Sequence, residues 1–95
     1  MSTGNHTIRA RLSADVMSER FGDEIVLLNL KTNRFFSLNR TGARLWELLA
    51  AGERLEAIEE QLCREFEVDR AQVTVEVERM VASLNKEQLL ELEEG

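Results

Sequence analysis

Hydrophobic residues in the first half of the chain form three short runs separated by turn residues, a pattern typical of β-strands. The runs are Val16–Phe21 (VMSERF), residues 24–30 (EIVLLNL) and Arg34–Leu38 (RFFSL). Gly22 and Asp23 stand between the first two runs, and residues 31–33 (KTN) stand between the second and third. Because glycine and asparagine tolerate the backbone conformations of tight turns, these residues predict a three-stranded antiparallel meander.

In the second half, hydrophobic residues recur at every third or fourth position, which predicts three amphipathic helices. Asn39 can cap the start of the first helix, and Gly52 suits a left-handed cap at its end. Asp69 can cap the third helix, where Gln72 completes the pattern of a capping box. The three hydrophobic stripes are Ala43, Trp46, Leu49 and Ala50; Leu55, Ile58, Leu62 and Phe66; and Val73, Val77, Met80, Val81 and Leu84.

The order of these elements defines the expected fold class. It is α+β and winged-helix-like, with an N-terminal three-stranded antiparallel sheet followed by three helices. Leu89, Leu90 and Leu92 predict a final short segment that packs back on the core. The chain has no proline, no Ser/Gly-rich linker and no repeat, so residues 1–95 are expected to form one domain. The polar residues 1–7 are expected to be disordered.

Charge and composition narrow the possible partners. The net charge of -6 argues against nucleic acid as the partner. Residues 1–46 carry a charge of +3 and residues 47–95 a charge of -9, which can steer a charged partner or reflect only an uneven solvated surface. No hydrophobic run approaches the roughly 20 residues of a membrane span, and residues 1–11 lack the core of a signal peptide. Cys63, the single cysteine, cannot form an internal disulfide, so we expect a cytoplasmic protein.

The residues that usually carry catalysis are scarce. The single histidine, His6, lies in the polar N-terminal segment, and Cys63 beside Leu62 is expected to be a buried thiol with no histidine near it. No Cys/His spacing matches a zinc site, and all five glycines are isolated, so no phosphate-binding loop is present. The sequence therefore predicts no enzyme, no metal and no cofactor.

The third strand, Arg34–Leu38, offers a binding surface. It ends the meander, so one of its backbone edges is expected to lack a strand partner. Alternation places Phe36 and Leu38 on one face and Phe35 and Ser37 on the other. An exposed edge with aromatic residues is prone to unwanted pairing unless something covers it. An extended peptide could add there as a fourth strand, while a helix or a second copy of the chain are the alternatives.

Two stretches resemble the PqqD-like family, the peptide-recognition domains of ribosomal peptide natural-product pathways. They are residues 24–49 (EIVLLNLKTNRFFSLNRTGARLWELL) and residues 77–90 (VERMVASLNKEQLL), and the resemblance spans residues 12–92. The most specific positions are Leu38, Asn39, Gly42, Ala43 and Trp46. The stand-alone form is most similar to the leader-binding proteins of lasso-peptide pathways. The chain departs from the family at Asn33 and Gln88, where glycine is common, and the second departure puts the end of the last helix in doubt.

The resemblance implies a function and a site. The leader of a precursor peptide would add to the third strand, in the groove between that strand and the third helix, and would be presented to a separate leader protease and then a cyclase. The implied site residues are Arg34, Phe35, Phe36, Ser37 and Leu38 on the strand, and Val73, Glu76, Val77, Met80 and Ser83 on the helix. Arg34 and Arg79 could pair with acidic leader residues, whereas Trp46 is expected in the core.

A winged-helix DNA-binding regulator has a similar inventory of elements and is the alternative function. It needs a basic recognition helix, but the third helix offers Glu76 and Glu78 against Arg79. A structural dimer joined through strand edges is a further possibility. The sequence does not name the precursor, the partner enzyme or the exact product class.

Overall fold

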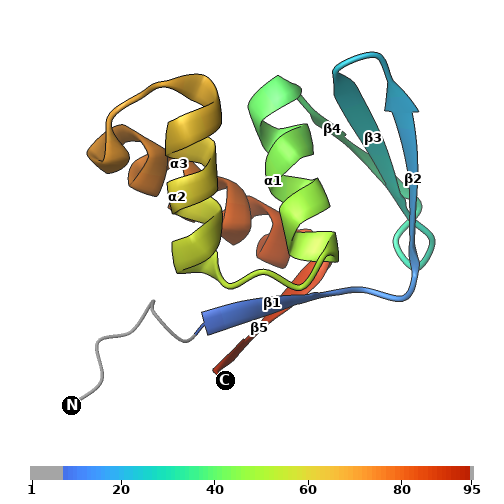
Figure 1. The fold of residues 1–95 in the computed structure, drawn as a ribbon. Coiled ribbons are helices and arrows are strands. Elements are labelled where there is room, and N and C mark those ends of the chain that lie inside the picture. Colours follow the sequence, from blue (N-terminus) through green and yellow to red (C-terminus); the bar gives the residue numbers. More distant parts are fainter. Residues whose placement is uncertain (1–7, 95) are drawn as a thin grey trace.

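The computed structural model describes residues 8–94, so the expectations for residues 1–7 and for His6 lie outside the described residues. Five strands and three helices follow one another in the chain (Figure 1). They are β1 (Ile8–Leu12), β2 (Val16–Phe21), β3 (Glu24–Asn29), β4 (Arg34–Leu38), α1 (Arg40–Ala50), α2 (Leu55–Phe66), α3 (Arg70–Lys86) and β5 (Leu90–Glu94). The α+β class with a three-stranded sheet before three helices is confirmed.

Strands β2, β3 and β4 form the predicted antiparallel meander, in the order β2-β3-β4. Strand β3 ends at Asn29, one residue before the predicted end. The two turns contain Gly22, with φ of 63°, and Asn33, with φ of 61°. Asn33 therefore adopts the left-handed conformation that asparagine tolerates better than most residues, so its departure from the family's glycine is accommodated.

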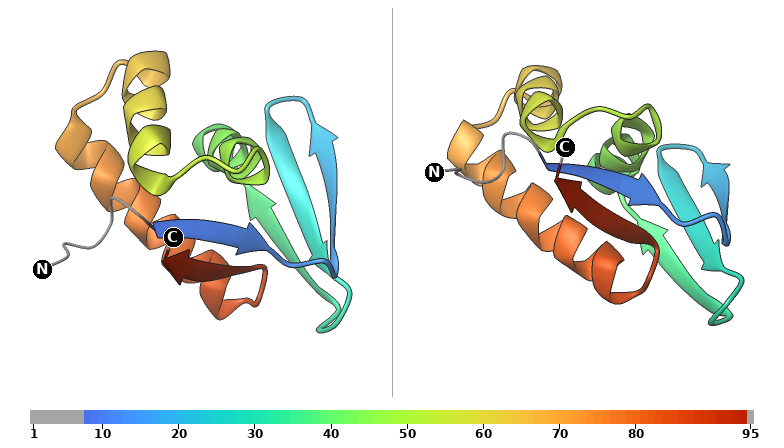
Figure 2. Two further views of the ribbon diagram at one scale, coloured as in Figure 1. Left: turned by 60° about the horizontal axis from the view of Figure 1, so that its bottom comes forward. Right: turned by 90° about the horizontal axis from the view of Figure 1, so that it is seen from below.

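The helices cover one face of this sheet. Helix α1 lies between the sheet and α2, and α3 crosses behind them (Figures 1 and 2). Alternate residues of β3 and β4, among them Ile25, Leu27 and Leu38, point toward the helices and are buried. Trp46 is 6% exposed and belongs to the core, as predicted. No helix of residues 8–94 covers the opposite face of the sheet.

The helix ends follow the predictions in part. The Asn39 side chain caps α1 by accepting a hydrogen bond from the Gly42 N–H at 2.9 Å. Gly52, with φ of 86°, adopts the left-handed conformation just after α1 ends. Asp69 is the residue at which α3 starts, but its side chain makes no capping hydrogen bond. The predicted capping box is therefore wrong, although the start of the helix is right.

The last segment does pack back, but as a strand. Leu89 and Leu90 are buried, while Leu92 is 45% exposed. Strand β5 pairs antiparallel with β1 and forms a separate two-stranded ribbon that the sequence analysis did not predict. Gln88, with φ of 61°, adopts the left-handed conformation that favours glycine, and α3 ends at Lys86 before the chain turns into β5. In the described part of the chain, no helix is both long and apolar enough to cross a bilayer.

Candidate functional site

Strand β4 is an edge strand. Among the described residues it pairs with β3 alone, so the main-chain groups along its other side have no strand partner. Phe36 is half-buried and Leu38 is 1% exposed, and both point toward the helices. Phe35 points to the opposite face and is 71% exposed. The alternation predicted from the sequence is therefore present.

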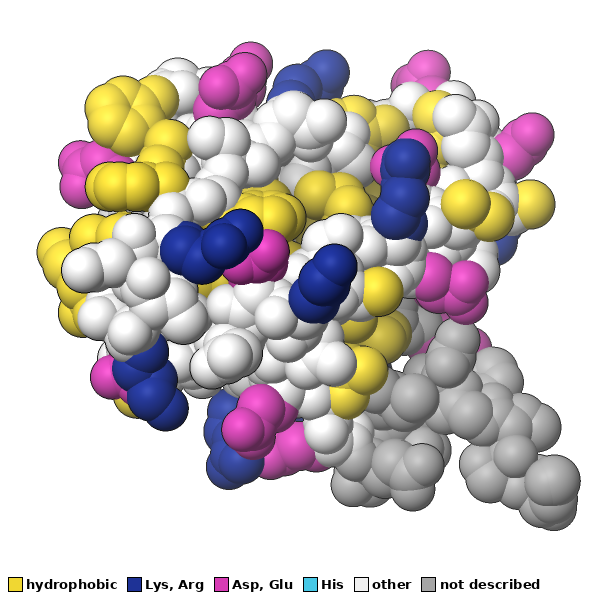
Figure 3. Space-filling view, turned by 180° about the vertical axis from the view of Figure 1, so that it is seen from behind, with side chains coloured by type: hydrophobic (Ala, Val, Ile, Leu, Met, Phe, Trp, Pro, Cys, Tyr) yellow, Lys and Arg dark blue, Asp and Glu magenta, His cyan; other side chains and the backbone are white. Residues whose placement is uncertain are grey.

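A groove of about 310 Å³ runs between β4 and α3. Viewed from behind, hydrophobic side chains lie recessed in the middle of the molecule with charged side chains around them (Figure 3). The residues that line the groove are Phe36, Ser37, Leu38, Asn39, Glu76, Arg79, Met80 and Ser83. Phe36, Leu38 and Met80 supply its apolar lining and the other residues its polar lining, which suits an extended chain with alternate apolar side chains.

A second, apolar hollow of about 230 Å³ lies next to the groove, near the end of β4. The two share Asn39, Glu76 and Met80, so they form one continuous depression. The remaining residues around the second hollow are Thr41, Leu45, Leu62, Phe66, Val68, Gln72, Val73 and Val77. It is large enough for an aliphatic or aromatic side chain, so we call it the anchor pocket.

Most of the predicted site residues line this depression. Phe36, Ser37, Leu38, Glu76, Arg79, Met80 and Ser83 line the groove. Val73 and Val77 are 5% and 2% exposed, so they form the wall of the anchor pocket rather than an exposed flank. Arg34 and Phe35 line neither hollow.

Sequence reasoning missed the contribution of α1 and α2 to the anchor pocket. Phe66 is the last apolar residue of the α2 stripe, and it is only half-buried. Asn39 was identified as a helix cap, but it also lines both hollows. Phe66 could have been identified from the sequence, because it is the last apolar residue of its stripe and so lies at the helix end, where the core no longer covers it.

The two arginines expected to meet acidic leader residues already have partners within the chain. Arg34 forms an ion pair with Glu87, with 3.0 Å between Nε and Oε1. Arg79 pairs with Glu76 on the same helix at 2.7 Å. An acidic peptide would therefore have to compete with these carboxylates, and exposed pairs of this kind are each worth less than about 1 kcal/mol.

Asn29 links the sheet to the end of α3. Its side chain is 1% exposed and joins β3 to the end of α3, since Nδ2 donates to the Glu87 carbonyl at 2.9 Å. Its Oδ1 accepts from the Lys31 N–H at 2.9 Å and so orders the turn into β4. A buried amide with these partners is costly to disturb, so β4 and α3 are positioned together.

Gly42 lets α1 approach α3 beside the groove. A Cβ atom at Gly42 would run into the methyl group of Met80. Met80 lines both hollows, so the absence of a side chain at Gly42 leaves room for the flexible thioether that separates them. This packing gives a physical reason for glycine in the LNRTGA stretch.

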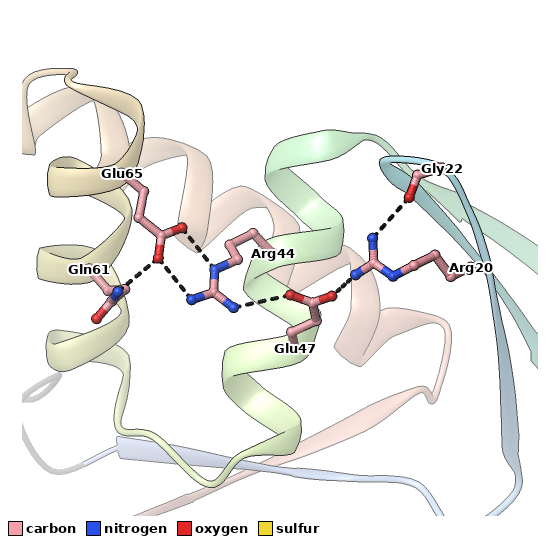
Figure 4. A network of polar contacts seen from close by, with 6 residues as sticks. All are labelled: Arg20, Gly22, Arg44, Glu47, Gln61 and Glu65. Carbon is pink, nitrogen blue, oxygen red and sulfur yellow. Dashed lines mark hydrogen bonds and ion pairs between the residues drawn. The ribbon is translucent and has the colours of Figure 1, made fainter.

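On the opposite flank of the sheet, a polar network joins β2, α1 and α2 (Figure 4). Arg44 binds Glu65 through two hydrogen bonds of 2.8 Å and binds Glu47 at 3.1 Å. Glu47 also forms an ion pair with Arg20 of β2. The hydrogen bonds from Arg44 and then Gln61 lower the pKa of Glu65 to about 2.

The described residues also bear on metal binding and on nucleophilic chemistry. Residues 8–94 contain no group of three or more His, Cys, Asp and Glu side chains arranged to hold a metal ion. Cys63 is half-buried on α2 and is a free thiol. The depression combines apolar side chains with polar ones, a lining that can bind an extended chain.

Known proteins resemble this chain in sequence and in fold. The profile of the family described as coenzyme PQQ synthesis protein D (PqqD) matches residues 24–90. A solved structure titled TbiB1 in complex with the TbiA(beta) leader peptide is 38% identical and superposes with a TM-score of 0.82. The match covers 85% of this chain and 94% of that chain. No curated protein sequence gives a significant match.

Proposed function

The chain belongs to the PqqD family, and on this premise we propose that it binds the leader region of a ribosomally made precursor peptide by strand addition to β4. The observation that carries this proposal is the unpaired β4 edge with an apolar depression directly beside it. The similar structure of TbiB1 was solved with a leader peptide, which supports the same class of ligand here. The product would belong to the lasso-peptide class.

The site residues follow from this geometry. The bound leader would pair its backbone with Arg34–Leu38 and place alternate side chains between β4 and α3. Backbone hydrogen bonds contribute only about 0.5–1.5 kcal/mol each, and ordering the peptide costs at least about 4 kcal/mol. Side chains in the groove and the anchor pocket must supply the rest, at about 1.5–3 kcal/mol for each buried apolar group. They therefore decide which peptide binds.

The domain itself does no chemistry in this proposal. It presents the precursor to a separate leader protease, and then to a cyclase. We also place this step in the cytoplasm, where a free thiol such as that of Cys63 stays reduced.

The alternative of a DNA-binding regulator finds no support. Helix α3 would be its recognition helix, but the side chain of Arg79 is paired with Glu76, and Glu78 adds a further negative charge. Proteins that bind the phosphate backbone of DNA present clusters of lysine and arginine, and α3 has no such cluster.

A titration followed by NMR tests the proposal. The probe is the synthetic leader of the precursor encoded in the same gene neighbourhood, added to the ¹⁵N-labelled chain. We expect the amide signals of Arg34–Leu38 and of residues 72–83 to shift, while those of β1 and β5 stay in place. Unchanged β4 signals at saturating leader would refute strand addition, and shifts confined to other elements would place the peptide elsewhere.

A further inference from the structure

Exposed hydrophobic side chains gather on the face of the β2–β4 sheet that no helix covers. Seven large hydrophobic side chains are exposed in the described part of the chain; three of them lie on this face, and a fourth, Leu30, lies in the turn directly after β3. They are Met17 (59%), Phe21 (61%), Leu30 (51%) and Phe35 (71%). We call this surface the outer face. The largest apolar patch on a protein surface is often a functional one.

The cross-strand register turns part of this face into a continuous row. Met17 is the partner of Leu28, and Leu28 is the partner of Phe35, so the three side chains cross the whole sheet side by side. In the view from behind, hydrophobic side chains project at the left margin, where the sheet lies (Figure 3). If a leader adds beside β4, its residue opposite Phe35 lengthens the row by one side chain.

We propose that the outer face docks the enzyme that processes the precursor, and that the bound leader completes the docking surface. This inference rests on the proposed function. One side of the augmented sheet would hold the leader's anchors against α3, and the other would present the leader's remaining side chains next to Phe35. An enzyme seated there touches the domain and its substrate together, so it distinguishes a loaded domain from an empty one.

The size of the face favours a transient enzyme over a second copy of the chain. Three strands about 4.8 Å apart and about 20 Å long present roughly 300 Å², and a leader strand raises this to roughly 400 Å². A stable dimer buries about 800 Å² on each partner, so this face alone falls short. Two copies would also each bring a net charge of -6, which opposes their association. A small apolar surface suits an enzyme that must leave after cleavage.

The outer face lies far enough from the leader site for the two to be tested separately. Met17 and Phe21 belong to β2, two strands from the β4 edge, which is about 10 Å. Neither residue lines the groove or the anchor pocket. A substitution at Met17 can therefore test docking without touching the leader, whereas Phe35 lies on the strand that would pair with it.

The experiment uses the full chain, its leader and the purified leader protease encoded beside the precursor gene. Met17→Lys and Phe21→Lys are compared with Val75→Lys, which changes a side chain of α3 that is 62% exposed. Leader affinity is measured by fluorescence anisotropy, and protease binding to the loaded and empty domain by biolayer interferometry. We expect Met17→Lys and Phe21→Lys each to weaken protease binding at least about tenfold, because each removes an anchor residue of the interface. Their affinity for the leader should stay within about twofold of the wild-type value.

The control and the remaining measurements separate the alternatives. Val75→Lys should leave both affinities unchanged, and the wild-type loaded domain should bind the protease more tightly than the empty one. Equal protease binding by wild type and both outer-face variants would overturn the docking face while leaving leader binding intact. A mass that rises with concentration in the wild type and not in Met17→Lys would make the face a self-interface and overturn the inference. Failure of the wild type to bind leader would overturn the proposed function and this inference together.

Discussion

The β2–β4 sheet has two edges, and they differ in what surrounds them. Both β2 and β4 have one side without a strand partner among the described residues. Strand β2 carries Glu19 and Arg20 in its middle, and both are exposed. A second chain pairing antiparallel about either residue would set two glutamates or two arginines opposite each other, which is unfavourable. Strand β4 has no charge between Phe35 and Leu38 and lacks this protection.

The flanks of the two strands differ even more. The hollow beside β2, of about 190 Å³, is lined by six charged residues, and the network of Arg20, Glu47, Arg44 and Glu65 crosses it (Figure 4). The hollow beside the end of β4 is lined mainly by apolar residues, among them Leu45, Leu62 and Phe66, and Glu76 is its one charged residue. A free edge alone is thus insufficient for peptide binding. The edge needs an apolar depression next to it, because side-chain anchors supply most of the net affinity.

The largest expected effect comes from placing a charge in the β4 flank. Met80→Glu puts a carboxylate between the groove and the anchor pocket, since Met80 lines both. An unpaired charge beside a buried leader side chain should weaken leader binding by about 2 kcal/mol or more, or roughly 30-fold. Isothermal titration calorimetry with the synthetic leader measures this change.

Val75→Glu is the matched control on the same helix. Val75 is 62% exposed and lines neither hollow, so the same added charge there should leave leader affinity nearly unchanged. If Met80→Glu and Val75→Glu bind leader equally well, the leader does not use the anchor pocket. The difference between the two flanks would then not explain where the leader binds.

The second effect concerns the charged flank and its dependence on pH. Hydrogen bonds from Arg44 lower the pKa of Glu65 to about 2, from an ordinary value of 4.5. Glu65→Gln should reduce the free energy of unfolding at pH 7 by about 1 kcal/mol, because solvent screens this partly exposed pair. Urea denaturation followed by circular dichroism measures the difference.

The sign of the pH dependence follows from the lowered pKa. The folded state holds the ionised carboxylate more strongly than the unfolded state, so the stabilisation is complete above about pH 4.5. It is lost progressively as the pH falls from 4.5 toward 2, and below that Glu65→Gln and the wild type should be equally stable. Glu60→Gln, an exposed change on the same helix, serves as control. A wild-type advantage that persists unchanged below pH 2 would contradict this account.

The two edge strands also show which features of the structure could be predicted from the sequence. Arg34–Leu38 and Val16–Phe21 were predicted with their observed bounds, because short hydrophobic runs between turn residues define strands locally. Asn39 and Gly52 were read correctly for the same reason, since a cap depends on a few neighbouring residues. Asp69 was misread as a hydrogen-bonded cap because a capping pattern does not fix the side-chain rotamer.

Features that depend on distant parts of the chain were missed or left incomplete. Strands β1 and β5 pair across nearly the whole chain, and neither run is distinctive on its own. The anchor pocket combines Leu45, Leu62 and Val77 from three helices, so no local pattern reveals it. The same limit explains Arg34, whose partner Glu87 lies 53 positions away in sequence.

The smallest expected effect comes from removing the charges that protect the β2 edge. Glu19→Thr combined with Arg20→Thr leaves an uncharged edge strand but keeps the other charged residues of its flank, among them Arg44 and Glu47. Because no apolar depression is created, leader affinity should change by less than about 0.5 kcal/mol, as is usual for surface changes away from a site. Leader-induced NMR shifts should stay on β4, as in the wild type. New shifts on β2 of the variant would mean that edge chemistry alone selects the binding strand, and that the apolar flank of β4 is not required.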